Sequence, residues 1–97
     1  MRRATALHIL AGHQQELRKR FGVKSLRLFG SVARDEASEG SDVDVLVDFD
    51  DTPSLFGFLR LQTYLQDLLG AKVDLITETG LKDRARPRVE RDAINVA

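Results

Sequence analysis

The chain has 97 residues, 42% of them hydrophobic and 31% charged, with no cysteine and a formal net charge of zero. This balance is typical of one globular domain over residues 1–97 and excludes a disordered or fibrous chain. The lack of cysteine excludes a disulfide framework and thiolate chemistry.

The amino-terminal segment predicts a helix and not a targeting signal. It begins with arginines, as a signal peptide does, but His8, Gly12 and His13 interrupt the apolar stretch before a hydrophobic region can form. Leucines at helical spacing predict one amphipathic helix over about residues 4–21 that ends at Gly22. We therefore expect a cytoplasmic protein. We also expect no membrane segment, because no stretch approaches the ~18 to 20 apolar residues that cross a bilayer.

Two strands with a polar connection follow in the predicted order. "KSLRLFG" (24–30) alternates apolar and polar residues and predicts a short strand, and Ser31 begins a helical turn. "GSDVDVLVDF" (40–49) predicts a second strand. Its period of two places Val43, Val45 and Val47 on one face and Asp42 and Asp44 on the other.

The second half of the chain predicts a helix, a strand and a short final helix. Thr52 and Pro53 are typical of a helix start, and the leucines and phenylalanines of residues 55–69 predict a core-facing stripe up to Gly70. "AKVDLITE" (71–78) predicts a third strand, and a basic segment after Gly80 predicts a helix near residues 88–93. The order indicates an α/β domain in which helices pack on a small mixed β-sheet.

This topology brings three carboxylates together. Strands joined by a short connection run antiparallel, so Gly30 and Ser31 lie beside Asp42 and Asp44. The helix over 53–69 makes the third strand parallel to the second, which brings Asp74 to the same end. Such carboxylates repel each other by about 1 kcal/mol per pair in water. Divalent cations, Mg²⁺ in particular, offset this repulsion.

The Gly-Ser turn supplies what a triphosphate needs beside such a metal site. Gly30 permits close approach of the backbone, Ser31 offers a hydroxyl, and a helix start favours anions. The charge distribution agrees, because residues 1–34 carry a net charge of +7 (eight basic residues, one acid) and residues 35–80 carry −9 (two basic residues, eleven acids). The pattern predicts a phosphoryl or nucleotidyl transfer site with basic flanks.

The segment "GSVARDEASEGSDVDVLV", with "KVDLIT" after it, resembles the signature of the polymerase-beta nucleotidyltransferase superfamily, in its minimal nucleotidyltransferase (MNT) branch. The resemblance spans about Phe21 to Val96 and implies that superfamily's fold. It further implies that Gly30 and Ser31 hold the triphosphate and that Asp42 and Asp44 bind two Mg²⁺ ions. Asp74 would bind the catalytic ion and help to activate the acceptor hydroxyl.

Two more residues and a partner follow from the resemblance. Arg34 is expected to contact phosphate, although an ordinary surface ion pair is an equal alternative, and Ser41 is assigned to nucleotide binding. The implied reaction moves AMP from ATP to a protein, and many MNT domains act in this way as antitoxins of HEPN-domain ribonuclease toxins. Larger members of the superfamily carry a second, helical domain that grips the acceptor, and we expect no such domain within these 97 residues. We therefore expect a partner protein or an oligomer to complete the cleft, without membrane or direct nucleic-acid binding.

Two hypotheses from different classes therefore stand. In the first, the chain is an enzyme that adenylylates a protein partner. In the second, it is a non-catalytic nucleotide-binding module that masks a toxin by direct contact. The three aspartates favour the enzyme. Pro87, inside the expected closing helix, leaves the geometry of that segment open.

Overall fold

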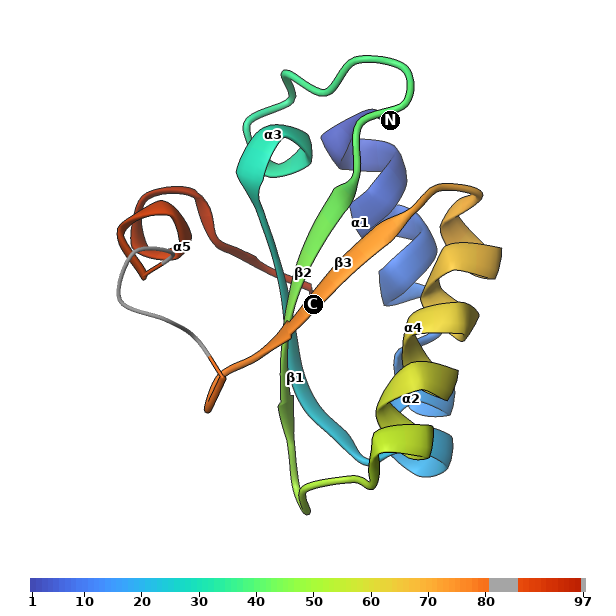
Figure 1. Ribbon diagram of the computed structural model, residues 1–97. Helices are drawn as coiled ribbons and strands as arrows, with labels where there is room; N and C mark the ends of the chain where they lie inside the picture. Colours follow the sequence, from blue (N-terminus) through green and yellow to red (C-terminus); the bar gives the residue numbers. More distant parts are fainter. Residues whose placement is uncertain (81–85, 97) are drawn as a thin grey trace.

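The computed structural model describes residues 1–80 and 86–96. In chain order the elements are α1 (Arg3–Ala11), α2 (Gln14–Phe21), β1 (Val23–Phe29), α3 (Gly30–Ala33), β2 (Val43–Phe49), α4 (Leu55–Leu69), β3 (Val73–Thr77), α5 (Arg86–Asp92) and β4 (Ile94–Asn95). The strands form one sheet in the order β3-β2-β1-β4 (Figure 1). The predicted α/β class, a small mixed sheet with helices packed on it, is confirmed.

The strand directions are those that the connections predict. β1 and β2 are antiparallel, and Phe29 pairs with Asp44. β2 and β3 are parallel, and Asp44 pairs with Asp74. The edge strand β4 pairs antiparallel with Arg27 and Leu28 of β1. It was not predicted, because a strand of two residues is too short to show an alternating pattern.

The two faces of the sheet are covered differently. Helices α1, α2 and α4 lie on one side, and α5 lies on the other (Figure 1). The larger core lies on the three-helix side, where the strands contribute Leu26, Leu28, Val43, Val45, Val47, Val73 and Leu75. On the opposite face a smaller cluster joins Phe29 and Leu46 to Val89 of α5. This second face also carries Asp44 and Asp74, because side chains alternate along each strand.

The single amino-terminal helix predicted over residues 4–21 is wrong, because the structure has two helices there. α1 ends at Ala11 and α2 starts at Gln14. Glycine is unfavourable inside a helix by about 1 kcal/mol. Between the helices, the N–H of His13 bonds to the carbonyl of Leu10, and its ring Nδ1 donates to the carbonyl of Ile9 at 2.8 Å.

The start of α4 also differs from the prediction. The N-cap is Ser54, whose Oγ accepts the N–H of Gly57 at 3.2 Å, and Thr52 and Pro53 precede the helix. The predicted core stripe is fully buried only in the later turns, where Leu61, Leu65 and Leu69 lie at every fourth position. In the earlier turns Phe58 is partly buried and packs against the core, whereas Leu55 and Leu59 are exposed.

The closing helix is regular despite Pro87. α5 starts at Arg86, so Pro87 lies in the first turn, where a helix needs no N–H donor. The basic stretch over residues 81–85 lies outside the described residues. Within residues 1–80 and 86–96, every helix is too short or too polar to cross a bilayer.

Candidate active site

Gly30 joins the two halves of the site. It follows β1, has a φ of +71°, and is buried. A Cβ added at this position would lie 2.1 Å from Oδ2 of Asp44, closer than any non-bonded contact allows. The position therefore requires glycine for two reasons, the left-handed backbone conformation and the carboxylate that lies against its Cα.

The sheet register places two of the predicted carboxylates side by side. Asp44 of β2 and Asp74 of β3 are direct partners in the parallel pair, so both side chains lie on the same face. Asp42, one residue before β2, has the same parity as Asp44. Asp42 and Asp74 are exposed, and Asp44 is partly buried.

Asp44 is the carboxylate of this group whose pKa is shifted. Burial raises its pKa, and the negative charges of Asp74 and Asp42 raise it further. The guanidinium groups of Arg88 and Arg34 act in the opposite direction without reversing the shift. A carboxylate that is disfavoured by burial and by like charges is stabilised when a cation arrives.

The remaining predicted residues hold the connection between β1 and β2. Ser31 is the second residue of α3, and its carbonyl accepts the N–H of Glu36 at 2.8 Å. Ser41 Oγ accepts the N–H of Ser38 at 3.2 Å and lies 3.1 Å from the Ser38 hydroxyl. Ser41 thus makes hydrogen bonds within the loop that precedes Asp42. The nucleotide-binding roles of Ser31 and Ser41 stay predictions.

Arg34 lies at the carboxyl end of α3 and makes two ion pairs. Its Nη1 donates to Asp92 of α5 at 2.6 Å, and its Nε donates to Glu36 at 3.0 Å. The side chain of Asp92 is only 3% exposed. The pair therefore connects α3 to α5, as the ion-pair alternative predicts, and a phosphate contact by Arg34 stays a prediction.

Sequence reasoning missed two residues of α5 that belong to these surroundings. The Cζ of Arg88 lies 5.8 Å from the centroid of the Phe29 ring, and its charge lowers the pKa of Asp44. Asp92 is the buried partner of Arg34. A signal was present in "RPRVERD", because residues three apart share a helix face. If Val89 is assigned to the core, Asp92 lies on the buried side with it.

The carboxylates fit a hard divalent cation, although they are not arranged as a complete ligand set. In residues 1–80 and 86–96, no three His, Cys, Asp or Glu side chains are placed so that they could hold one metal ion. The donor chemistry is nevertheless that of Mg²⁺, which binds carboxylate oxygens. Burial is the main cause of the raised pKa of Asp44, and the charges of Asp74 and Asp42 add to it, so a bound cation would favour the ionised carboxylate.

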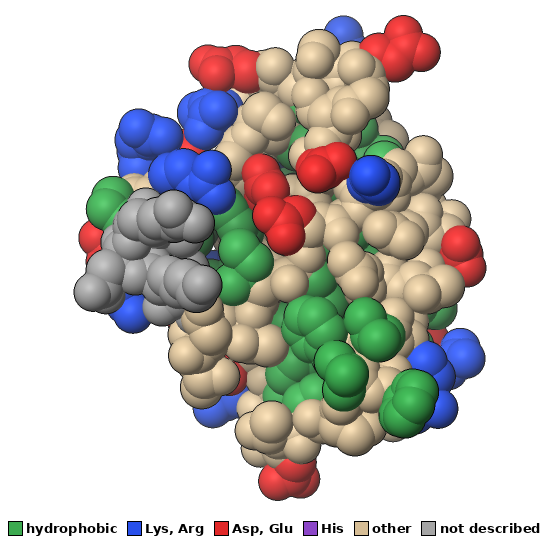
Figure 2. Space-filling view, in the orientation of Figure 1, with side chains coloured by type: hydrophobic (Ala, Val, Ile, Leu, Met, Phe, Trp, Pro, Cys, Tyr) green, Lys and Arg blue, Asp and Glu red, His purple; other side chains and the backbone are tan. Residues whose placement is uncertain are grey.

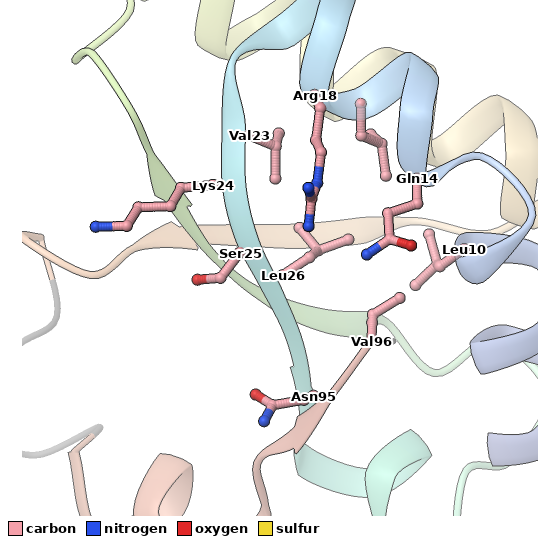
Figure 3. A pocket seen from close by; sticks show the side chains of 10 residues that line it. Leu10, Gln14, Arg18, Val23, Lys24, Ser25, Leu26, Asn95 and Val96 are labelled. Atoms are coloured by element: carbon pink, nitrogen blue, oxygen red, sulfur yellow. The ribbon is translucent and has the colours of Figure 1, made fainter.

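A cavity elsewhere in the molecule does not belong to this site. It has a volume of about 290 Å³ and lies at the Val23 end of β1, between α2 and β4 (Figure 3). Arg18 and Lys24 line it together with apolar side chains, and no acidic residue in the described part of the chain lines it. Asp44 pairs with Phe29 at the other end of β1.

Comparison with known proteins identifies the family of this chain. The nucleotidyltransferase domain family matches residues 10–96. The chain belongs to this family. A curated relative, the protein adenylyltransferase MntA of Thermococcus cleftensis, is 49% identical over 91% of this chain and 89% of its own length. The chain is thus a nucleotidyltransferase.

Solved structures support the same assignment. One of a candidate minimal nucleotidyltransferase is 42% identical, with a TM-score of 0.78, and the match covers 97% of this chain and 95% of that one. The fold is also that of an MNT antitoxin solved with the tri-AMPylated HEPN toxin of Shewanella oneidensis. That match has a TM-score of 0.67 at 18% identity and covers 94% of this chain and 71% of that chain.

Proposed function

We propose that this nucleotidyltransferase transfers AMP from ATP to a protein partner and thereby acts as an antitoxin of a HEPN-domain toxin. The observation that carries the proposal is the pairing of Asp44 with Asp74, with the carboxylate of Asp44 against Gly30 at the Gly-Ser turn. The 49% identical relative is named a protein adenylyltransferase. The fold neighbour from Shewanella oneidensis pairs an MNT antitoxin with an AMPylated HEPN toxin.

Each group has a defined task in this reaction. The backbone at Gly30 and Ser31 binds the triphosphate, because the missing Cβ of Gly30 lets the Asp44 carboxylate lie beside this turn and the start of α3 has N–H groups without a partner inside the helix. Asp42, Asp44 and Asp74 would hold two Mg²⁺ ions, which neutralise the negative charge of the triphosphate when bound. Arg88, on the same face, adds a positive charge near Asp44.

The transfer step exchanges one phosphorus–oxygen bond for another. The acceptor hydroxyl oxygen of the partner attacks the α-phosphorus of ATP, and the bond from that phosphorus to the bridging oxygen breaks, so pyrophosphate leaves. The exposed carboxylate of Asp74 receives the proton of the hydroxyl. Positioning and charge neutralisation supply most of the catalysis in phosphoryl chemistry of this kind.

The experiment combines the purified chain with ATP, Mg²⁺ and the HEPN-domain protein encoded beside it. Intact-mass spectrometry should show the addition of AMP to that protein. The double variant Asp42→Asn with Asp44→Asn should bind the partner yet transfer AMP about 10²-fold or more slowly, the range for the loss of a preorganised charge stabiliser. Asp48→Asn with Asp50→Asn, the same charge change further along the chain, is the matched control.

The masking hypothesis predicts a different result. If the module acts by contact alone, the Asp42→Asn and Asp44→Asn double variant will neutralise the toxin in cells as well as the wild-type chain does. No mass shift will then appear with either protein. That pair of results would remove the enzymatic function.

A further inference from the structure

The amino-terminal half of α4 exposes large apolar side chains. Leu55 is 71% exposed, Phe56 76% and Leu59 44%, and no other large hydrophobic side chain in residues 1–80 and 86–96 reaches this class of exposure. Isolated exposed leucines are ordinary, but three such residues within five positions form a patch. We call these three residues the α4 patch.

The α4 patch borders a hollow between α2 and α4 with an aromatic floor. The hollow has a volume of about 430 Å³, and Phe56 and Leu59 line it. Phe21 and Tyr64 line it too, with ring centroids 4.9 Å apart. The Cζ of Arg20 lies 5.2 Å from the centroid of Phe21 and 5.7 Å from that of Tyr64. The guanidinium of Arg20 therefore packs against both aromatic rings.

The rim of this hollow is mainly basic. Arg20 and Arg60 line it, with Asp67 as the acidic member, and the same two arginines line a second hollow at the start of α4. Arg20 is paired with Glu16 at 3.6 Å across exposed side chains. Arg60 makes no ion pair within the part of the chain that the structure describes. An occupant that brings a carboxylate to Arg60 would complement this rim.

The α4 patch and the carboxylates are accessible from one side of the molecule. Figure 2 shows hydrophobic side chains gathered over the amino-terminal half of α4, below a group of acidic side chains near the starts of β2 and β3. Because α4 and these carboxylates belong to opposite faces of the sheet, a protein that lies on the α4 patch would reach the site by extending past the edge strand β3. Free ATP alone would not need such an apolar surface.

We propose that the α4 patch is the docking surface for the protein acceptor. The acceptor inserts a helix that carries apolar side chains, with an Asp or Glu beside them that reaches Arg60. A groove between two helices suits a third helix, and aromatic side chains such as Phe56 are common anchors in protein interfaces. This inference rests on the proposed function, because it assigns the surface that holds the protein to be modified.

The test compares two double variants with the wild-type chain. The first, Phe56→Ser with Leu59→Ser, removes the apolar surface, and the second, Phe56→Leu with Leu59→Met, keeps it. The probe is the HEPN-domain protein encoded beside the chain, titrated by calorimetry and used as acceptor with ATP and Mg²⁺. We expect the serine variant to raise the Kd of the complex at least tenfold, as losing interface anchors does. The conservative variant should remain within about threefold of wild type.

The kinetic readout separates docking from chemistry. The serine variant should raise the KM for the acceptor while kcat and the affinity for ATP stay unchanged. Arg60→Glu should also weaken the complex, and Lys24→Glu, an exposed residue on β1, should not. These charge variants keep the test valid if the serine variant folds poorly.

Three outcomes would contradict these proposals, and each identifies which proposal fails. If the wild-type chain modifies the acceptor and the serine and Arg60→Glu variants bind it as tightly, the docking inference is wrong and the proposed function stands. If the wild-type chain neither binds nor modifies the acceptor, the proposed function fails and the inference fails with it. If binding occurs without transfer, the enzymatic proposal fails, and with it the assignment of an acceptor.

Discussion

Asp44 should make the chain less stable in the absence of a cation. Its pKa is raised by burial and by Asp74, so its contribution to stability is present below about pH 4, the ordinary range of an aspartate, and is lost as pH rises through the raised value. Asp44→Asn keeps the shape without the charge, and we expect a higher Tm than wild type at pH 7 and no difference at pH 3. Thermal unfolding without divalent ions measures both.

The control for this measurement is the variant Asp48→Asn. Asp48 lies further along the same face of β2 as Asp44. Asp48 has no carboxylate partner in β3, because the register ends with Val47 beside Thr77. An equal increase in Tm at pH 7 for both variants would mean that the effect comes from removing any negative charge and is not specific to Asp44. A lower Tm for Asp44→Asn would show that the carboxylate is stabilised by its surroundings.

Gly30→Ala should destabilise the fold through a specific contact. An alanine at a φ of +71° is strained, and its Cβ would also meet Oδ2 of Asp44 at 2.1 Å. Gly70→Ala is the matched control, since Gly70 has a φ of +64° with nothing within 4 Å of the added Cβ. We expect a loss of about 1 to 2 kcal/mol for Gly70→Ala and a larger loss for Gly30→Ala in urea unfolding. Equal losses would mean that Asp44 moves aside freely.

At the scale of elements, the cap of α4 gives a direct test of where the helix begins. Ser54→Ala removes the acceptor for the N–H of Gly57 and should cost about 1 kcal/mol, which lowers Tm by about 4 to 8 °C in a domain of this size. Thr52→Ala should leave Tm unchanged, because Thr52 precedes the helix. A larger loss of Tm for Thr52→Ala than for Ser54→Ala would instead support a helix start at Thr52, as the sequence predicted.

The ion pair of Asp92 with Arg34, which connects α3 to α5, should stabilise the fold at neutral pH and lose this effect in acid. This pH dependence is the opposite of that expected for Asp44. The hydrogen bond from Arg91 lowers the pKa of Asp92, and Arg34 adds to this while burial opposes it. The contribution of Asp92 is therefore present above its ordinary pKa of about 4 and is lost as pH falls through the lowered value. Asp92→Asn should lower Tm at pH 7, and the gap should close in acid. Glu90→Gln, exposed on the same helix, should show no such gap.

The elements differ in how far the sequence could predict them, and the difference has a physical cause. β2 was predictable because the alternation from Val43 to Val47 is set by burial on one face. The pairing of Asp44 with Asp74 followed from two local rules of strand direction. The break at Gly12, the cap at Ser54 and the strand β4 depend on single hydrogen bonds or on tertiary pairing, which periodicity does not encode. Arg88 was missed because its position requires the placement of α5.

In the whole molecule, the larger core and the candidate site lie on opposite faces of the sheet. The three-helix side holds the larger core, and the opposite face carries Asp44 and Asp74, with α5 packed on that face and Gly30 of α3 against Asp44. The side chains that form the larger core therefore differ from the carboxylates proposed for catalysis. A substitution in the site can then stabilise the chain by itself and still remove its response to ligand.

That separation yields the last prediction, made with the intact chain. If ATP with Mg²⁺ binds the folded state alone, as the proposed function requires, ligand at 100 times its Kd should add about 2.7 kcal/mol and raise the Tm of the wild-type chain by roughly 10 °C or more. ATP with EDTA should give a much smaller rise. Asp44→Asn should begin at a higher Tm than wild type and show almost no rise with ATP and Mg²⁺. A purely structural role for Asp44 cannot produce this crossing, whereas a wild-type-sized rise in the variant would remove Asp44 from the nucleotide site.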